Sequence, residues 1–247
     1  PRQIVIGHAA ISDPTRRRLW KAQRVARAGF GLAEAREGDT DARLDGWNLV
    51  RRDDYYETRV ASDQFGFELT LDRTQPPMLN GAGGYSQKGP QPASASGYYS
   101  VPQLRVSGRV VRNGKRDDVT GEAWLDHEWS SAYLDGQATG WDWIGLNLDD
   151  GGALMAFRIR GRDGATRWAG GTLQVYLNLA GRDPAGGGLQ QVAATDEAST
   201  VAAIRAKCSA EPASRGSWAG AMAWGRLRAA FGDGAGAMVL SPSPTPE

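Results

Sequence analysis

Residues 98–129, YYSVPQLRVSGRVVRNGKRDDVTGEAWLDHEW, decide the fold class. Apolar and polar side chains alternate with period two over residues 104–110, as they do on a half-buried strand. Asn113-Gly114 follows, and this dipeptide is typical of a two-residue hairpin turn. The segment therefore predicts two antiparallel strands, residues 98–111 and 119–129, joined by a tight turn.

Further strand signals lie on both sides of this hairpin. Residues 65–71 alternate strictly, and Asp149-Asp150-Gly151-Gly152 predicts another tight turn. Other strands are expected at residues 3–11, 44–50, 55–60, 140–148, 153–160 and 168–179. One helix is expected at residues 20–27, and residues 75–96 are expected to form a long loop, either a lid over a pocket or a connector. Short strands separated by turns predict an all-β protein, an antiparallel β-barrel or sandwich.

The composition narrows the classes of function. The chain has 247 residues and a net charge of +1, with a mean hydropathy of −0.47. No basic stripe stands out, so nucleic acid is not expected as a partner. The single cysteine, Cys208, excludes a disulfide within the chain, and two histidines exclude a His-rich zinc site. No metal and no cofactor are expected. No apolar stretch reaches the length needed to span a bilayer.

One short stretch, GEAWLDHEW at residues 121–129, concentrates the side chains that carry chemistry. Asp126, His127 and Glu128 are consecutive, and Trp124 and Trp129 flank them. Carboxylates and an imidazole among indoles are the residue types that general acid–base chemistry uses. This stretch is therefore the candidate site.

An aromatic–acid triplet, Trp141-Asp142-Trp143, follows on the neighbouring expected strand, so the two segments can meet. A carboxyl group desolvated among tryptophans has a raised pKa and can keep its proton. Asp126 is the first candidate for such an acid, and Asp142 is the second. The indole faces of Trp124, Trp141 or Trp143 would stabilise a carbocation formed by protonating a carbon–carbon double bond.

The remaining candidate residues complete this chemistry. His127 or Glu128 would hold the attacking water or take its proton. Tyr133 is close enough in sequence to assist. The further candidates for contact with a ligand are Trp129, Tyr98 and Tyr99.

Strand geometry limits which of these side chains can act together. On a regular strand Asp126 shares a face with Trp124 and Glu128, whereas His127 shares the opposite face with Trp129. Asp126 and His127 cannot both enter one pocket unless a bulge intervenes. We favour the Asp126 face. The alternative is a structural cluster in which an indole N–H donates to the carboxylate and His127 has no catalytic part.

Four segments together resemble one family. They are residues 6–13 (IGHAAISD), 83–90 (GGYSQKGP), 98–108 (YYSVPQLRVSG) and 121–143, with WLDHEWSS and GWDW as the most specific parts. They look like the lipocalin-like, AttH-like family of predicted secreted hydrolases, related to carotenoid 1,2-hydratase (hydroxyneurosporene synthase). The resemblance implies lipocalin-like β-barrel domains, two in succession, usually behind a signal peptide or lipid anchor. It also implies a periplasmic or secreted location and an association with the membrane or an ABC-type exporter.

The chain departs from the family pattern at both ends. Family members carry further N-terminal strands before the equivalent of His8, and strand alternation fades here after about residue 171. Residues 1–171 are therefore expected to form a lipocalin-like β domain that lacks its first strands. Residues 172–247 are expected to be a poorly patterned region, a truncated or frame-shifted second β domain.

Three functions follow from these observations. The first is a hydratase-like lyase that adds water to an apolar, carotenoid- or lipid-like ligand and needs no cofactor. The second is a non-catalytic carrier of a hydrophobic ligand, associated with an export system. The third is the hydrolase that the family's customary name implies, ranked last because no Gly-x-Ser-x-Gly motif is present.

Overall fold

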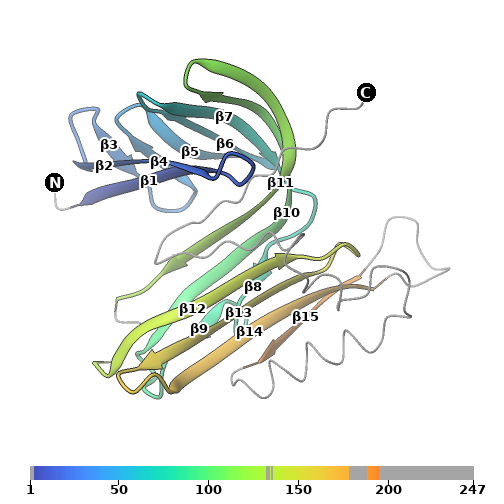
Figure 1. Ribbon diagram of the computed structural model, residues 1–247. Coiled ribbons are helices and arrows are strands. Elements are labelled where there is room, and N and C mark those ends of the chain that lie inside the picture. Colours follow the sequence, from blue (N-terminus) through green and yellow to red (C-terminus); the bar gives the residue numbers. More distant parts are fainter. Residues whose placement is uncertain (1–2, 132–133, 135, 178–187, 195–247) are drawn as a thin grey trace. The chain divides into compact units, whose positions relative to one another are not determined.

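A computed structural model describes residues 3–131, 134, 136–177 and 188–194 (Figure 1). These residues form antiparallel strands and turns, and none of them lies in a helix. The predicted all-β, antiparallel class is therefore confirmed. The strands are β1 (Ile4–Asp13), β2 (Arg18–Arg27), β3 (Ala33–Ala35), β4 (Asp41–Leu44), β5 (Trp47–Arg52), β6 (Tyr55–Ala61), β7 (Phe65–Asp72), β8 (Met78–Leu79), β9 (Tyr85–Gln87), β10 (Ala95–Arg112), β11 (Lys115–Trp129), β12 (Ala138–Asn147), β13 (Ala153–Gly161), β14 (Thr166–Leu177) and β15 (Gly188–Ala194).

The chain divides into two compact units. The first contains residues 3–74 and 104–123, and the second contains residues 75–103 and the described residues from 124 to 194. β10 and β11 each contribute one part to either unit. β14 runs without a break through residue 171, where the sequence pattern predicts a domain boundary.

The first unit is built on a meander. Its strands pair in the order β3-β4-β5-β6-β7 and continue to β10 and β11, while β1 and β2 form a separate two-stranded ribbon. Asn113 and Gly114 join β10 to β11 with positive φ angles of 49° and 79°, so the predicted hairpin turn is confirmed. The buried core of this unit includes Trp20, Leu44 and Tyr56.

The helix predicted at residues 20–27 is wrong, because this segment is β2. Its exposure alternates, with Trp20, Ala22 and Arg24 on the inward face. Ala22 pairs with Ala9 of β1 in a regular register. The Arg, Lys, Gln and Ala side chains of the segment have good helix propensity, but the tertiary pairing outweighs a preference of less than about 1 kcal/mol per residue.

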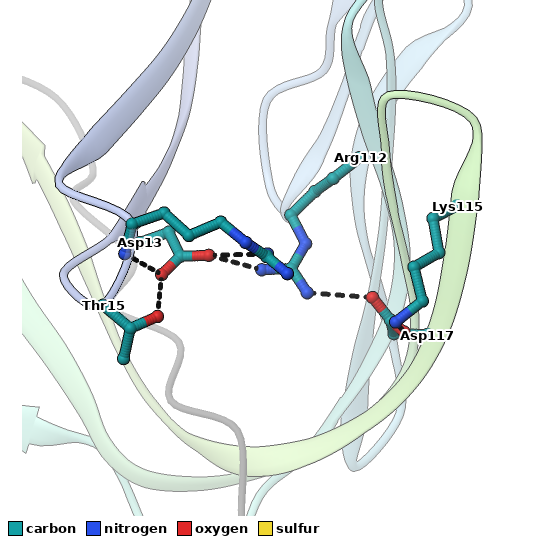
Figure 2. Close-up of polar contacts among 6 residues, drawn as sticks. Asp13, Thr15, Arg112, Lys115 and Asp117 are labelled. Atoms are coloured by element: carbon teal, nitrogen blue, oxygen red, sulfur yellow. Dashed lines mark hydrogen bonds and ion pairs between the residues drawn. The ribbon is translucent and has the colours of Figure 1, made fainter.

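A polar cluster at the end of β1 stabilises the first unit (Figure 2). Asp13 is 7% exposed, and its carboxylate accepts hydrogen bonds from Thr15 Oγ1 (2.6 Å) and from the backbone N–H of Arg16 (3.1 Å). Its Oδ2 atom lies 3.0 Å from Nη1 of Arg16 and 3.0 Å from Nη1 of Arg112. Arg112 also donates to Asp117 at 2.8 Å. These contacts tie β1 to the β10–β11 hairpin across 99 positions of sequence.

The second unit contains a four-stranded sheet of order β12-β13-β14-β15, and the short strands β8 and β9 pair with β10 (Figure 1). Its apolar core includes Met78, Tyr98, Trp124, Met155 and Phe157. The predicted loop at residues 75–96 is thus partly wrong, because it contains β8 and β9.

The described sheets are open. The strand path ends at β11 and β3 in the largest sheet and at β12 and β15 in the four-stranded sheet, and β1 and β2 form a separate ribbon. The predicted closure into a barrel is therefore not found among the described residues. What is confirmed is the lipocalin-like all-β class. The part of the chain that the structure describes holds no helix of the length and hydropathy needed to cross a bilayer.

Candidate active site

The two faces of β11 carry different chemistry within the second unit. On one face Asp126 and Glu128 accept hydrogen bonds from Ser100 and Ser96 of β10. On the other face His127 stacks against Tyr99 of β10. One face of β10 therefore carries residues 96, 98 and 100, and the other face carries residues 97 and 99. The predicted separation of Asp126 from His127 is confirmed.

Asp126 is held by neutral hydrogen-bond donors. Its Oδ1 atom accepts from Ser100 Oγ at 2.6 Å and from Trp124 Nε1 at 2.8 Å, and the Tyr98 hydroxyl also bonds to the carboxyl group. Desolvation raises the pKa of Asp126 to about 6, and the charge of Glu128 adds to this rise. The three hydrogen bonds oppose the rise but do not cancel it. Asp126 therefore changes its protonation state near neutral pH.

Tyr98 connects Asp126 to Trp143 of β12. Trp143 Nε1 donates to the Tyr98 hydroxyl at 2.8 Å, and burial raises the pKa of Tyr98 well above 10. The phenol therefore stays protonated and can donate to the carboxyl group. Trp143 also meets Trp124 edge to face, with ring centroids 6.3 Å apart. The two sequence segments expected to meet do so through these indoles.

Trp141 packs on the same apolar core as Trp143, but Asp142 does not join them. Asp142 lies on the opposite face of β12, where its side chain is 49% exposed and pairs with Arg158 (2.6 Å) and Arg160 (3.3 Å). The structure thus does not bring the second candidate acid to the Asp126 carboxyl group.

Glu128 has a partner that the sequence did not indicate. Lys88 Nζ lies 2.9 Å from Glu128 Oε1 and donates to Ser86 Oγ at 3.0 Å. The Lys88 side chain is only 5% exposed, and its ammonium group stands over the rings of Phe157 (4.0 Å) and Tyr98 (4.6 Å). Lysine is almost never fully buried, so its residue type pointed to solvent. A period-two relation to Ser86 was the one signal that could have placed it inward.

The outer face of β10 and β11 is aromatic. The Tyr99 hydroxyl lies 3.2 Å from His127 Nδ1, and the two rings stack with centroids 5.1 Å apart. Trp129 meets His127 edge to face at 5.3 Å and is 57% exposed. Any Cβ atom at Gly97 would overlap the Trp129 ring, so this glycine lets the indole lie against β10. Partial burial lowers the pKa of His127, which favours a neutral imidazole.

Tyr133 lies outside the described residues. Among the residues that the structure does describe, no three His, Cys, Asp or Glu side chains are grouped so that they could hold a metal ion.

Comparisons with known proteins agree with this architecture. A crystal structure of a candidate AttH protein from Nitrosomonas europaea is 49% identical, with a TM-score of 0.66. The match covers 76% of this chain and 56% of that protein, so the chain spans little more than half of its length. Kievitone hydratase from Nectria haematococca has a TM-score of 0.53 at 14% identity, which shows a shared fold, and the match covers 76% of this chain and 59% of that one. No curated protein matches the sequence.

The family assignment rests on the larger part of the sequence. The AttH-like family model matches residues 1–181. The matched range contains all the described strands of the first unit and the whole Asp126 cluster. This protein therefore belongs to the AttH-like family.

Proposed function

We propose that this protein adds water to a carbon–carbon double bond of an apolar, carotenoid- or lipid-like ligand. The observation that carries the proposal is the environment of Asp126. Its carboxyl group lies among tryptophans, has only neutral hydrogen-bond donors, and has a pKa raised to about 6. A general acid works best when its pKa is near the working pH, and this one keeps a usable protonated fraction there.

The chemistry uses two carboxyl groups on one strand face. Asp126 gives its proton to one carbon of the double bond, and the other carbon becomes a cation. Indole faces of Trp124 and Trp143 stabilise this cation, an attraction of about 2 kcal/mol or more when the site is desolvated. Water attacks the cation and passes a proton to Glu128. Glu128 then releases this proton to solvent, and solvent returns a proton to Asp126. The product has gained one molecule of water.

The geometry favours Glu128 over His127 as the base. Glu128 shares the face of Asp126 and is bound by Ser96, whereas His127 is stacked with Tyr99 on the other side of the strand. Asp142 has no part in this scheme because its arginine partners hold it on the outer face of β12. Tyr99 and Trp129 likewise lie on the face away from the acid.

The family and fold support water addition without deciding the ligand. The sequence resembles relatives of carotenoid 1,2-hydratase, and the fold is shared with a protein named as a hydratase. A fold hosts many activities, so the proposal rests on the site and takes the fold as supporting evidence only. A periplasmic or secreted location and an association with an exporter remain predictions that cell fractionation and co-purification would test.

The direct test uses an organic extract of host cells as the source of ligand. The purified protein is incubated with the extract and re-isolated, and its lipids are analysed by mass spectrometry. We expect a polyene or unsaturated lipid that has gained one water, and no such product with Asp126→Asn. An unchanged ligand bound equally by both proteins would instead identify a carrier.

A further inference from the structure

Lys88 is a buried charge that the proposed reaction does not use. Its side chain lies just after β9, and its backbone N–H donates to the carbonyl of Ser94 at 2.7 Å. Burying an ammonium group costs several kcal/mol unless other groups compensate. The groups that surround the Nζ atom must therefore compensate for the burial of Lys88.

Those groups come from four strands. β9 supplies Ser86, whose Oγ accepts a hydrogen bond from Nζ at 3.0 Å. β11 supplies Glu128 at 2.9 Å and, further away, Asp126, whose charge also acts on the lysine. β10 supplies the ring of Tyr98 and β13 the ring of Phe157. Among the described residues, the one carboxylate within ion-pair distance of Lys88 is that of Glu128.

Lys88 thus acts on both carboxyl groups, by two different routes. It binds Glu128 directly. It reaches Asp126 through Tyr98, because its ammonium group stands over the Tyr98 ring while the Tyr98 hydroxyl bonds to Asp126. Residues two apart on a strand face are neighbours, so without a cation between them the two carboxylates would repel each other.

We infer that Lys88 is a positioning residue that holds Glu128 as the charged base and leaves Asp126 as the carboxyl group that carries the proton. The assignment of Asp126 as the acid and Glu128 as the base rests on the proposed function. The asymmetry between the two carboxyl groups does not depend on that function, because it concerns only which of them is protonated. It predicts that removing either member of the Lys88–Glu128 pair changes the titration of Asp126, in opposite directions.

The signs follow from the charges. Lys88→Met removes a positive charge that favours ionised Asp126, so the midpoint of Asp126 titration rises. Glu128→Gln removes a negative charge and leaves the Lys88 ammonium without its carboxylate, so the midpoint falls. A nearby charge shifts a carboxyl pKa by about one unit or more. The double variant Lys88→Met/Glu128→Gln should titrate close to the unmodified protein.

The experiment follows the Asp126 carboxyl carbon by NMR in the full chain labelled with ¹³C at aspartate, from pH 4 to 8. The Asp126 resonance is identified by its loss in Asp126→Asn. Lys115→Met is the matched control, because Lys115 is an exposed lysine paired with Asp117 at 2.8 Å in the first unit. It should leave the Asp126 midpoint unchanged.

A purely structural ion pair gives a different result. In that case both single variants lower stability, but the Asp126 midpoint stays at its original value, and the inference is overturned. Shifts of the same sign in both variants would overturn it too. If Lys88→Met fails to fold, Glu128→Gln alone decides, since a midpoint that does not fall contradicts the inference.

Failure of this inference is distinguishable from failure of the proposed function. The NMR titration measures protonation without any ligand, and the lipid experiment measures turnover. Opposite shifts without water addition would leave Lys88 as an organiser of a binding site. Water addition without shifts would leave Asp126 as the acid and remove the role of Lys88.

Discussion

Asp13 and Asp126 are two carboxylates with several hydrogen bonds each, one in either unit, and their pKa values move in opposite directions. Hydrogen bonds from Thr15 and from the backbone N–H of Arg16 hold the pKa of Asp13 below its usual range. At Asp13 desolvation ranks behind these bonds, and two guanidinium groups lie within 3.0 Å (Figure 2). At Asp126 desolvation is the largest influence, and the negative charge of Glu128 raises the pKa further.

Solvent exposure alone does not decide what a carboxylate does in this protein. Asp13 is only 7% exposed, yet its charge is stabilised by its partners. Asp126 has good hydrogen bonds as well, but neutral donors do not compensate for its desolvation. A carboxylate with cationic partners holds a fold together, whereas a desolvated one with neutral donors keeps a proton available for chemistry.

The largest expected effect is on turnover. Asp126→Asn should lower the rate of water addition by about 10²- to 10⁴-fold, because the amide cannot give a proton to carbon. The rate is measured by mass spectrometry on the ligand found in the lipid extract. Asp13→Asn is the matched control and should keep the rate per folded molecule. Equal rates for Asp126→Asn and the unmodified protein would exclude Asp126 as the acid.

The next effect is on stability, and it reverses the order of the two variants. At pH 7 Asp13→Asn should lower the melting temperature, because Arg16 and Arg112 lose a charged acceptor. Asp126→Asn should keep or raise it, because the amide oxygen still accepts from Ser100 and Trp124 and a desolvated charge is gone. Thermal unfolding followed by circular dichroism measures both. A larger loss for Asp126→Asn than for Asp13→Asn would contradict the comparison.

The stability of the protein should depend on pH in opposite ways at Asp126 and at Asp13. The folded-state pKa of Asp126, about 6, exceeds its reference value of 3.8, so the native state binds more protons between these values. Proton binding at Asp126 therefore contributes on the order of 3 kcal/mol to the free energy of unfolding. This contribution is fully present below pH 3.8 and is lost as the pH rises through about 6. Asp13 has a lowered pKa, so its contribution is present above its unfolded pKa and is lost as the pH falls through its folded pKa.

Urea unfolding at several pH values separates the two contributions. Asp126→Asn should remove the decline in stability between pH 3.8 and about 6. Asp13→Asn should leave that decline in place and weaken the acid-induced loss at lower pH. If Asp126→Asn keeps the full decline, another group causes it.

The smallest effects are expected away from the acid. Asp142→Asn removes exposed ion pairs with Arg158 and Arg160, which are worth less than about 1 kcal/mol. His127→Gln changes the outer face of β11 and should leave turnover nearly unchanged. Both are measured by the same unfolding and turnover assays. A loss of turnover as large as that of Asp126→Asn in either variant would move the reaction to the other face.

Local patterns made part of this structure predictable. Period-two alternation and Asn113-Gly114 predicted the β10–β11 hairpin, and strand geometry predicted that Asp126 and His127 face apart. The segment at residues 20–27 failed, because its residues favour a helix weakly and its pairing with β1 is set by contacts more distant in sequence. In the structure, exposed and inward positions alternate along this segment, as they do on a half-buried strand.

The all-β class, the tight turn of the central hairpin and the set of aromatic and acidic residues of the site could be derived from the amino-acid sequence alone. These features depend on residues that are close together in the sequence. The folded arrangement was needed to learn that Lys88 is buried beside Glu128 and that Asp142 is exposed and paired with arginines. It was also needed to learn that the pKa values of Asp13 and Asp126 shift in opposite directions. Charge, desolvation and hydrogen bonding act through space, so residues far apart in the sequence must first be brought together by the fold.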